Sequence, residues 1–117
     1  ECPILIEEVP SELFDNAVIL SNDCDISMLN GHYEEINFVA PEWYKILLKK
    51  CKHEHSILII NGINNSSEDE QLKFVEILKY RKISIFELPK NCSIIVTAYD
   101  IQNKPVAEEI YSLVAGV

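Results

Sequence analysis

The chain has 117 residues, 48% of them hydrophobic, with only three glycines, so it can bury one core; this excludes a disordered segment and indicates a single domain over residues 1–117. Nineteen acidic and ten basic residues give a net charge of −9, which repels a phosphate backbone and argues against a nucleic-acid partner. No apolar run approaches the roughly 18 residues that span a bilayer, so no membrane partner is expected.

The first part of the chain predicts two strands and one helix. Residues 2–9 predict a first strand, and residues 11–15 can form at most one or two helical turns. Residues 17–20 predict a second, buried strand, whereas residues 32–39 show no clear period. Residues 41–51 predict a helix, because Pro stands at its first position and apolar residues follow at spacings of three and four.

The middle of the chain predicts the central strand and the start of a helix. Residues 57–60 are four consecutive apolar residues stopped by Asn61 and Gly62, a pattern typical of a strand buried on both faces of a sheet. Ser67 and Glu70 form a capping box, which predicts a helix that begins at Ser67 and runs to about residue 80. A strand followed by a capped helix is half of a βαβ unit.

The last third of the chain predicts one more strand and a final helix. Residues 83–88 alternate imperfectly and predict a short extended arm, and residues 93–98 predict a β-branched strand. Pro105 opens the expected last helix, whose apolar stripe is Val106, Ile110, Leu113 and Val114. Strands separated by helical patterns predict an α/β fold with a parallel sheet.

The order of these pieces resembles the core of AAA+ P-loop ATPases, most closely the MoxR-type branch. The resemblance is carried by the runs at residues 59–65, 78–82, 87–91 and 96–99. In that family a Walker B strand precedes a helix and an arm, and a Leu-Pro turn leads into a strand ending in Thr-Ala-Asn. The resemblance implies a P-loop NTPase-like (AAA+-like) parallel sheet of about four strands flanked by helices, ordered 1-4-3-2. It also implies a truncated sheet that lacks the family's fifth strand, leaving the edge beside strand 1 open.

The positions that carry nucleotide chemistry in that family are replaced here. Glu8 and Ser11 stand in the region of the P-loop, where the glycines and the phosphate-binding Lys are missing. Asn61 and Gly62 stand where the family carries the Walker B Asp and Glu, and Tyr99 stands at the sensor Asn. The resemblance therefore implies a chain that is not an enzyme, with no catalytic residues, no nucleotide-binding residues and no cofactor.

The cysteines argue against a disulfide framework or a zinc ribbon, because they lie far apart and have no C-x-x-C spacing. They are Cys2, Cys24, Cys51 and Cys92. Reduced thiols in a cytoplasmic protein are the expected state.

One candidate metal site is present in the sequence. Cys51, His53 and His55 alternate, so on an extended segment their side chains would share one face and could hold a soft metal, with Cys24 as a fourth ligand. The alternative is a solvated helix end followed by the lead-in to a strand. Because the spacing fits no named zinc motif, we expect no metal here.

Three functions follow from these patterns. The first is a catalytically inactive AAA+-like domain that serves as a protein–protein interaction or assembly module, either self-associating or docking on a related ATPase. The second is an α/β protein with a non-standard nucleotide or metal site. The third is a remnant or fragment of a larger ATPase.

Overall fold

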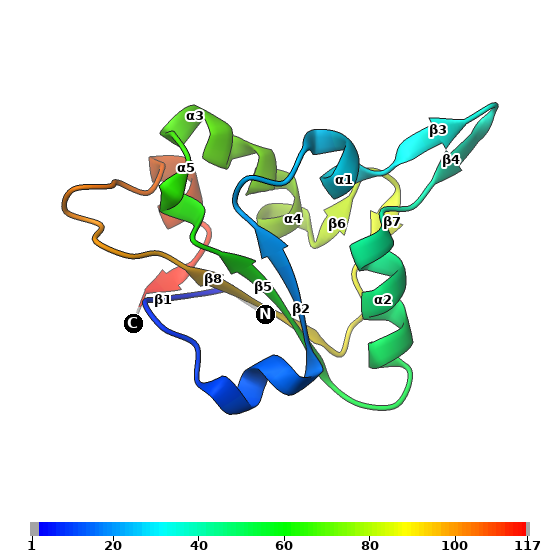
Figure 1. Ribbon diagram of the computed structural model, residues 1–117, viewed down its shortest axis with the longest axis horizontal. Coiled ribbons are helices and arrows are strands. Elements are labelled where there is room, and N and C mark those ends of the chain that lie inside the picture. Colours follow the sequence, from blue (N-terminus) through cyan, green and yellow to red (C-terminus); the bar gives the residue numbers. More distant parts are fainter. Residues whose placement is uncertain (1–2, 117) are drawn as a thin grey trace.

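The computed structural model describes residues 3–116. Within that range it describes every side chain except those of residues 11, 15, 16, 26, 27, 115 and 116. The fold is α/β, as the sequence predicts, with a parallel sheet packed against helices (Figure 1). None of the helices in the described range is long and apolar enough to cross a membrane.

The sheet has five strands in the order β2-β5-β8-β1-β9. They are β1 (Ile4–Ile6), β2 (Ala17–Ser21), β5 (Ser56–Asn61), β8 (Cys92–Thr97) and β9 (Ala115–Gly116). Every neighbouring pair is parallel. The four strands expected from the sequence therefore lie in the predicted order 1-4-3-2, counted from β1 to β2.

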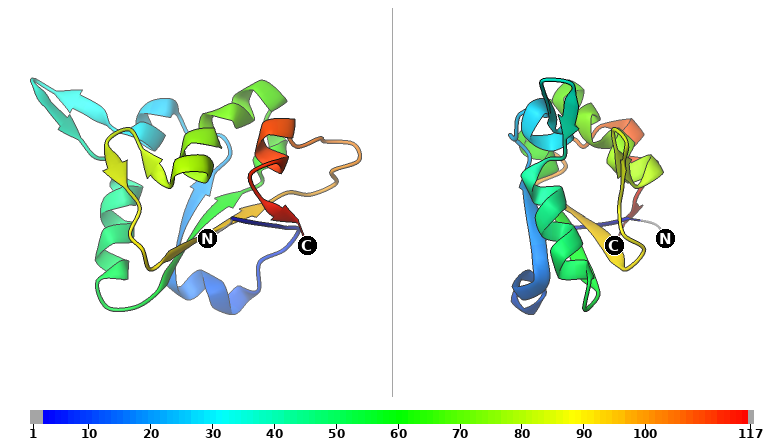
Figure 2. Two further views of the ribbon diagram at one scale, coloured as in Figure 1. Left: turned by 180° about the vertical axis from the view of Figure 1, so that it is seen from behind. Right: turned by 90° about the vertical axis from the view of Figure 1, so that its right-hand side faces the viewer.

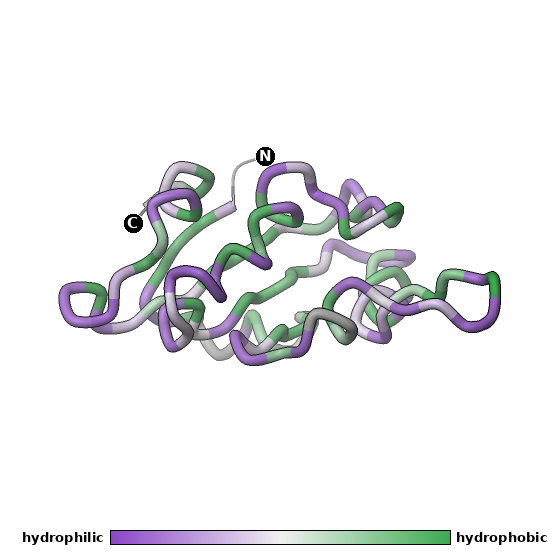
Figure 3. The backbone as a smooth tube through the Cα atoms, turned by 90° about the horizontal axis from the view of Figure 1, so that it is seen from above, coloured by the Kyte–Doolittle hydropathy of each residue, from purple (hydrophilic) through white to green (hydrophobic). Residues whose placement is uncertain are grey.

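The strand β5 lies inside the sheet, as its unbroken apolar run predicts. Leu58, Ile59 and Ile60 are all fully buried. Ile59 lies between Ile19 of β2 and Ile95 of β8 in the strand register. Figure 3 shows apolar residues along the strands in the middle of the molecule, whereas the loops at its two ends mix hydrophilic and apolar residues.

The expectation of a truncated sheet was wrong. A fifth strand, β9, pairs with β1, so that Ile4 lies opposite Ala115 and Leu5 opposite Gly116. The final helix is correspondingly short: α5 covers only Glu108–Tyr111. A strand of two residues has no hydrophobic period of its own, so the apolar residues around it resemble the end of a helix.

Helices cover one face of the sheet and a single short helix covers the other. On the first face lie α5 and the helices α2 (Glu42–Cys51), α3 (Glu68–Gln71), η3 (Leu72–Phe74) and α4 (Val75–Tyr80). On the second face, η1 (Ser11–Asn16, a 3-10 helix) brings Leu13 against a small core of Val9, Ile59 and Ile95. Figure 2 shows η1 on the opposite side of the molecule from α4 and α5.

The helix expected from Ser67 to about residue 80 begins where the sequence predicts and then breaks into three pieces. Ser67 Oγ accepts a hydrogen bond from Glu70 N at 3.3 Å, which confirms the predicted cap. The 3-10 segment η3 then interrupts the α-helix; Phe74 and Ile77 are fully buried, while Leu72 is 39% exposed.

Residues 32–39, which show no period in the sequence, form a hairpin of β3 (His32–Glu34) and β4 (Asn37–Val39) after the short helix α1 (Ile26–Asn30). The hairpin projects from the body (Figure 1). A second hairpin, β6 (Lys82–Ile83) and β7 (Phe86–Glu87), replaces the expected arm. The two hairpins touch where the rings of Phe38 and Phe86 stack, with their centroids 5.5 Å apart.

We predict that Gly31→Ala destabilises the protein. Gly31 has a φ of +89°, and a Cβ atom there would lie 2.3 Å from the carbonyl oxygen of Val39. Both the left-handed backbone and this clash oppose a side chain, so the free energy of unfolding should fall by about 2 kcal/mol or more in urea denaturation. Ile36→Ala, at the exposed hairpin tip, is the control and should change it by less than about 0.5 kcal/mol. Equal stability of the two variants would contradict the prediction.

Candidate functional site at the carboxyl edge of the sheet

The connections from the adjacent strands β1 and β8 run toward opposite edges of the sheet. The chain leaves β1 through η1 on one face toward β2, and it leaves β8 through α5 on the other face toward β9. In open α/β sheets, ligands bind outside the carboxyl ends of the strands at such a point. The two strand ends are adjacent, since Ala98 N donates to Ile6 O at 3.2 Å. This edge is therefore the candidate site of the fold.

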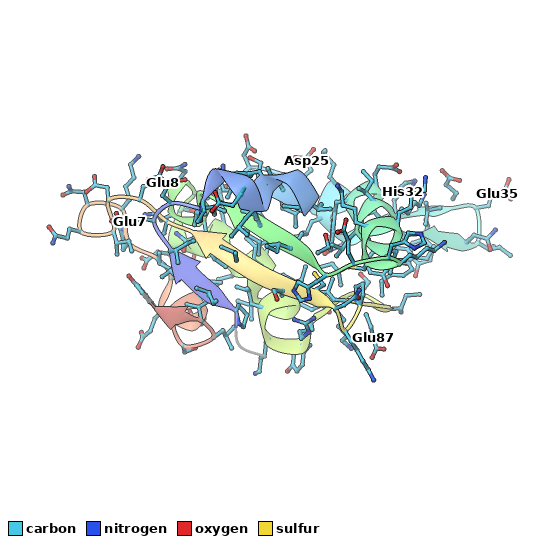
Figure 4. All side chains as sticks on the ribbon, turned by 90° about the horizontal axis from the view of Figure 1, so that it is seen from below. Glu7, Glu8, Asp25, His32, Glu35 and Glu87 are labelled. Atoms are coloured by element: carbon cyan, nitrogen blue, oxygen red, sulfur yellow. The ribbon has the colours of Figure 1, made fainter. Side chains whose placement is uncertain are left out.

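The loop after β1 is acidic on its outside and apolar on its inside. Glu7 and Glu8 are exposed (Figure 4), whereas Val9 is buried. The loop leads into the 3-10 helix η1, which offers no long helix N-terminus to an anion. The backbone of Ser11 begins η1, but its side chain lies outside the described residues.

The end of β5 is joined to the end of β8 by hydrogen bonds. Thr97 Oγ1 accepts from Gly62 N at 2.7 Å and donates to Asn61 Oδ1 at 2.9 Å. Thr97 is 1% exposed, so its bond with the Gly62 amide is shielded from water, whereas Asn61 lies at the exposed end of β5. The structure thus places Asn61 at the end of β5 and Gly62 directly after it, as the sequence predicts, and both residues connect β5 to β8.

The backbone at Gly62 has a conformation that a Glu would not readily adopt. Its φ is +66°, and a Cβ atom there would lie 2.7 Å from Asn65 Nδ2. Side chains are disfavoured in this left-handed region. The chain turns directly from Gly62 into the 3-10 helix η2 (Ile63–Asn65).

Tyr99 is held at the same edge through its backbone. Asn64 Oδ1 accepts from Tyr99 N at 3.1 Å, and Asn64 Nδ2 donates to the carbonyl oxygens of Tyr99 and Lys104. Asn64 is 4% exposed. One buried amide therefore fixes both ends of the loop that follows β8.

Two further contacts extend this network to both flanks. Asn22 Nδ2, just after β2, donates to Ser66 Oγ at 2.9 Å. Gln71, which is fully buried, donates to the carbonyl oxygens of Ser66 and Pro105 and accepts from Ala107 N at 2.7 Å. Among the described residues, no buried side-chain nitrogen or oxygen lacks a partner.

The edge is thus lined by neutral amides and hydroxyls, with the carboxylates of Glu7 and Glu8 outside them. The chain's single arginine, Arg81, lies at the other end of β8, where its Nη2 donates to the carbonyl oxygens of Pro89 and Cys92. Sequence reasoning missed the roles of Asn64, Thr97 and Gln71. Two of them could have been found from the sequence, because Thr97 ends a buried strand and Asn64 lies shortly after one.

The three candidate metal ligands are not brought together. Cys51 ends α2 and is buried, and the chain turns at residues 52–54, so the extended segment on which they would share a face does not form. His53 is exposed, and His55 Nε2 lies 2.8 Å from Ser93 Oγ. Cys24 lies near Lys73, whose Nζ donates to the Cys24 carbonyl oxygen. In residues 3–116, no group of three His, Cys, Asp or Glu could hold a metal ion.

The described cysteines, Cys24, Cys51 and Cys92, are free thiols. Burial raises the pKa of Cys92 to about 12, and it also raises the pKa of Cys51. Burial raises the pKa of Cys24 as well, although the nearby Lys73 ammonium opposes this shift. Cys24 alone of the three is partly exposed.

We predict that a thiol reagent separates these cysteines. In a Cys2→Ser variant at about pH 8, iodoacetamide should modify Cys24 at least about tenfold faster than Cys51 or Cys92, because buried thiols with raised pKa values are both shielded and protonated. Peptide mass spectrometry measures the three rates. In urea the rates should converge, and equal rates in the folded protein would contradict the prediction.

We also predict that the Thr97 hydroxyl stabilises the fold. Thr97→Val keeps the shape of the side chain but leaves the Gly62 amide without its acceptor, so the free energy of unfolding should fall by about 1–3 kcal/mol. Thr97→Ser keeps the hydroxyl and should lose less. Urea denaturation measures both, and a Val variant as stable as the original protein would show that the bond contributes nothing.

Comparison with known proteins assigns this edge no function. No protein-family model matches the chain, and no curated protein matches it. The geometry of the edge consists of five parallel strands in a defined order, with hydrogen-bonded neutral side chains at the ends of β5 and β8.

Proposed function

We propose that the chain is a catalytically inactive AAA+-like domain of the cytoplasm that acts as a protein–protein interaction or assembly module. The observation that carries the proposal is the closed hydrogen-bond network of Asn61, Gly62, Thr97 and Asn64 at the edge where such a fold would bind a nucleotide. Its polar atoms bond to one another and to the backbone. A phosphate oxygen that approached the Gly62 N–H would have to displace the Thr97 hydroxyl from it.

The strand order supports the AAA+-like part of the proposal. The resemblance implies the order 1-4-3-2, and the four expected strands lie in that order. The strand β9 lies beside β1, where the family carries its fifth strand and where this chain was expected to lack one. Connections that run through η1 on one face and through helices on the other are those of a doubly wound sheet.

The absence of catalysis is supported by shape as well as by residue type. At Gly62 the left-handed backbone and the nearby Asn65 amide leave no easy place for a carboxylate side chain. At the loop after β1, Glu7 and Glu8 would repel a triphosphate. Substituting a single residue would therefore not recreate a nucleotide site.

The interaction role is supported by the surface. Large apolar side chains are exposed on β2, on α1 and at the tip of the first hairpin: Ile19, Met28 and Ile36. The sheet also keeps an edge at β2, because β2 pairs with β5 alone among the described strands. An exposed strand edge with apolar side chains beside it is a surface on which another chain can pair.

We predict that calorimetric titration with ATP or ADP and Mg²⁺ gives no saturable binding up to about 1 mM ligand, a limit that corresponds to roughly −4 kcal/mol. The double variant E7Q/E8Q removes the repulsion and should still not bind, because the network at the strand ends remains closed. Asn61→Asp, which restores one acid, should also not bind. Micromolar binding, or measurable ATP hydrolysis, by the unmodified chain would overturn the proposal.

A further inference from the structure

We propose that the cavity beside the outer edge of β2 binds an extended segment of a partner protein in which Lys or Arg residues flank a large apolar residue. This inference rests on the proposed interaction function and deepens it by naming the surface and the chemistry of the partner. Three independent features support it: an apolar cavity, a strand edge and an excess of carboxylates.

The cavity has a volume of about 880 Å³ and lies between β2, α1, the base of the first hairpin and the start of α2. Ile19 and Met28 on its walls are 50% and 63% exposed. Trp43 also lines the cavity, and its Nε1 already donates to Leu29 O at 3.0 Å. The cavity can therefore accept a large apolar side chain without leaving the indole N–H unsatisfied.

The backbone of β2 offers hydrogen bonds beside this cavity. Asn22 N donates to Asn61 O, so the even-numbered residues of the strand direct their N–H groups toward β5. The N–H and C=O of Ile19 consequently point away from the sheet. A partner strand can pair there while its side chains reach the cavity.

The charges around the cavity select a basic partner. Among the residues that line it, the carboxylates outnumber the single lysine, Lys45; they belong to Asp23, Asp25, Glu34 and Glu42. Glu42 Oε2 lies 4.0 Å from Lys45 Nζ, but both side chains are exposed, so this pair neutralises little. Figure 4 shows Asp25, His32 and Glu35 following one another from the body toward the hairpin tip.

A second copy of the chain fits this surface less well. Pairing of two β2 edges around a twofold axis would bring the same carboxylates of both copies together. Like charges facing each other oppose such a contact, and the net charge of −9 adds to the repulsion.

The test is fluorescence anisotropy with a labelled peptide of about eight residues in which Lys alternates with Val and Leu. We expect saturable binding at about 10–100 μM that weakens as salt is raised. A peptide with Glu in place of Lys should not bind. A peptide of the original sequence with alternate amides N-methylated should bind at least about tenfold more weakly, because it cannot pair with a strand edge.

Two variants with the same change of charge locate the site. Ile19→Lys places a cation on the cavity wall and should weaken binding by at least about tenfold, since it removes an apolar contact and repels the peptide. Ile36→Lys makes the same change at the hairpin tip, which is 91% exposed and does not line the cavity, and should leave binding within about twofold. Circular dichroism checks that both variants fold.

Three other results would each overturn the inference. Equal binding to the two variants would mean that the peptide responds only to net charge. Self-association in analytical ultracentrifugation that Ile19→Lys abolishes would assign the surface to a second copy instead. Absence of peptide binding in a chain that also fails to bind ATP would reject this inference and leave the proposed function standing, whereas micromolar ATP binding would reject the proposed function.

Discussion

The structure depends on burying β5 from both sides. Ile59 packs toward Val9 and Ile95 on one face, while Leu58 and Ile60 face the helices on the other. Burying side chains of this size contributes about 1.5–3 kcal/mol each. Since β2 and β8 flank β5 in register, this strand also fixes where its neighbours end and so brings Gly62 beside Thr97.

The carboxyl ends of the strands and the outer edge of β2 carry different kinds of side chains. At the carboxyl edge, neutral groups bond to one another, and losing any partner leaves a buried polar group unsatisfied. These residues therefore belong to the framework. Around the outer edge of β2, large apolar side chains remain exposed beside carboxylates, and leaving the apolar groups in water is unfavourable. An exposed surface of that kind is available for contact with another molecule.

The main sheet could be predicted from the sequence because its strands are unmistakable. Residues 57–60 are an unbroken apolar run and residues 93–98 are rich in β-branched residues, and the cap at Ser67 is a local signal that needs no tertiary context. The short elements could not be predicted. The two-residue β9 and the hairpin at residues 32–39 have no period, and they form because tertiary partners, β1 and the ring of Phe86, hold them. The alternation of Cys51, His53 and His55 gave only a weak candidate site, and the shared face it needs does not form because a turn separates residues that a strand would align.

The pairing of β1 has a consequence for the order in which the protein can assemble. Within the described residues β1 pairs with β8 and β9, strands from the last part of the chain: Ile4 lies opposite Ile95 on one side and Ala115 on the other. During translation the first strand therefore leaves the ribosome long before either neighbour exists. Pairings between such distant segments close large loops and slow folding. The strands β2 and β5 can pair before β8 exists, so the first strand joins a sheet that is already partly formed.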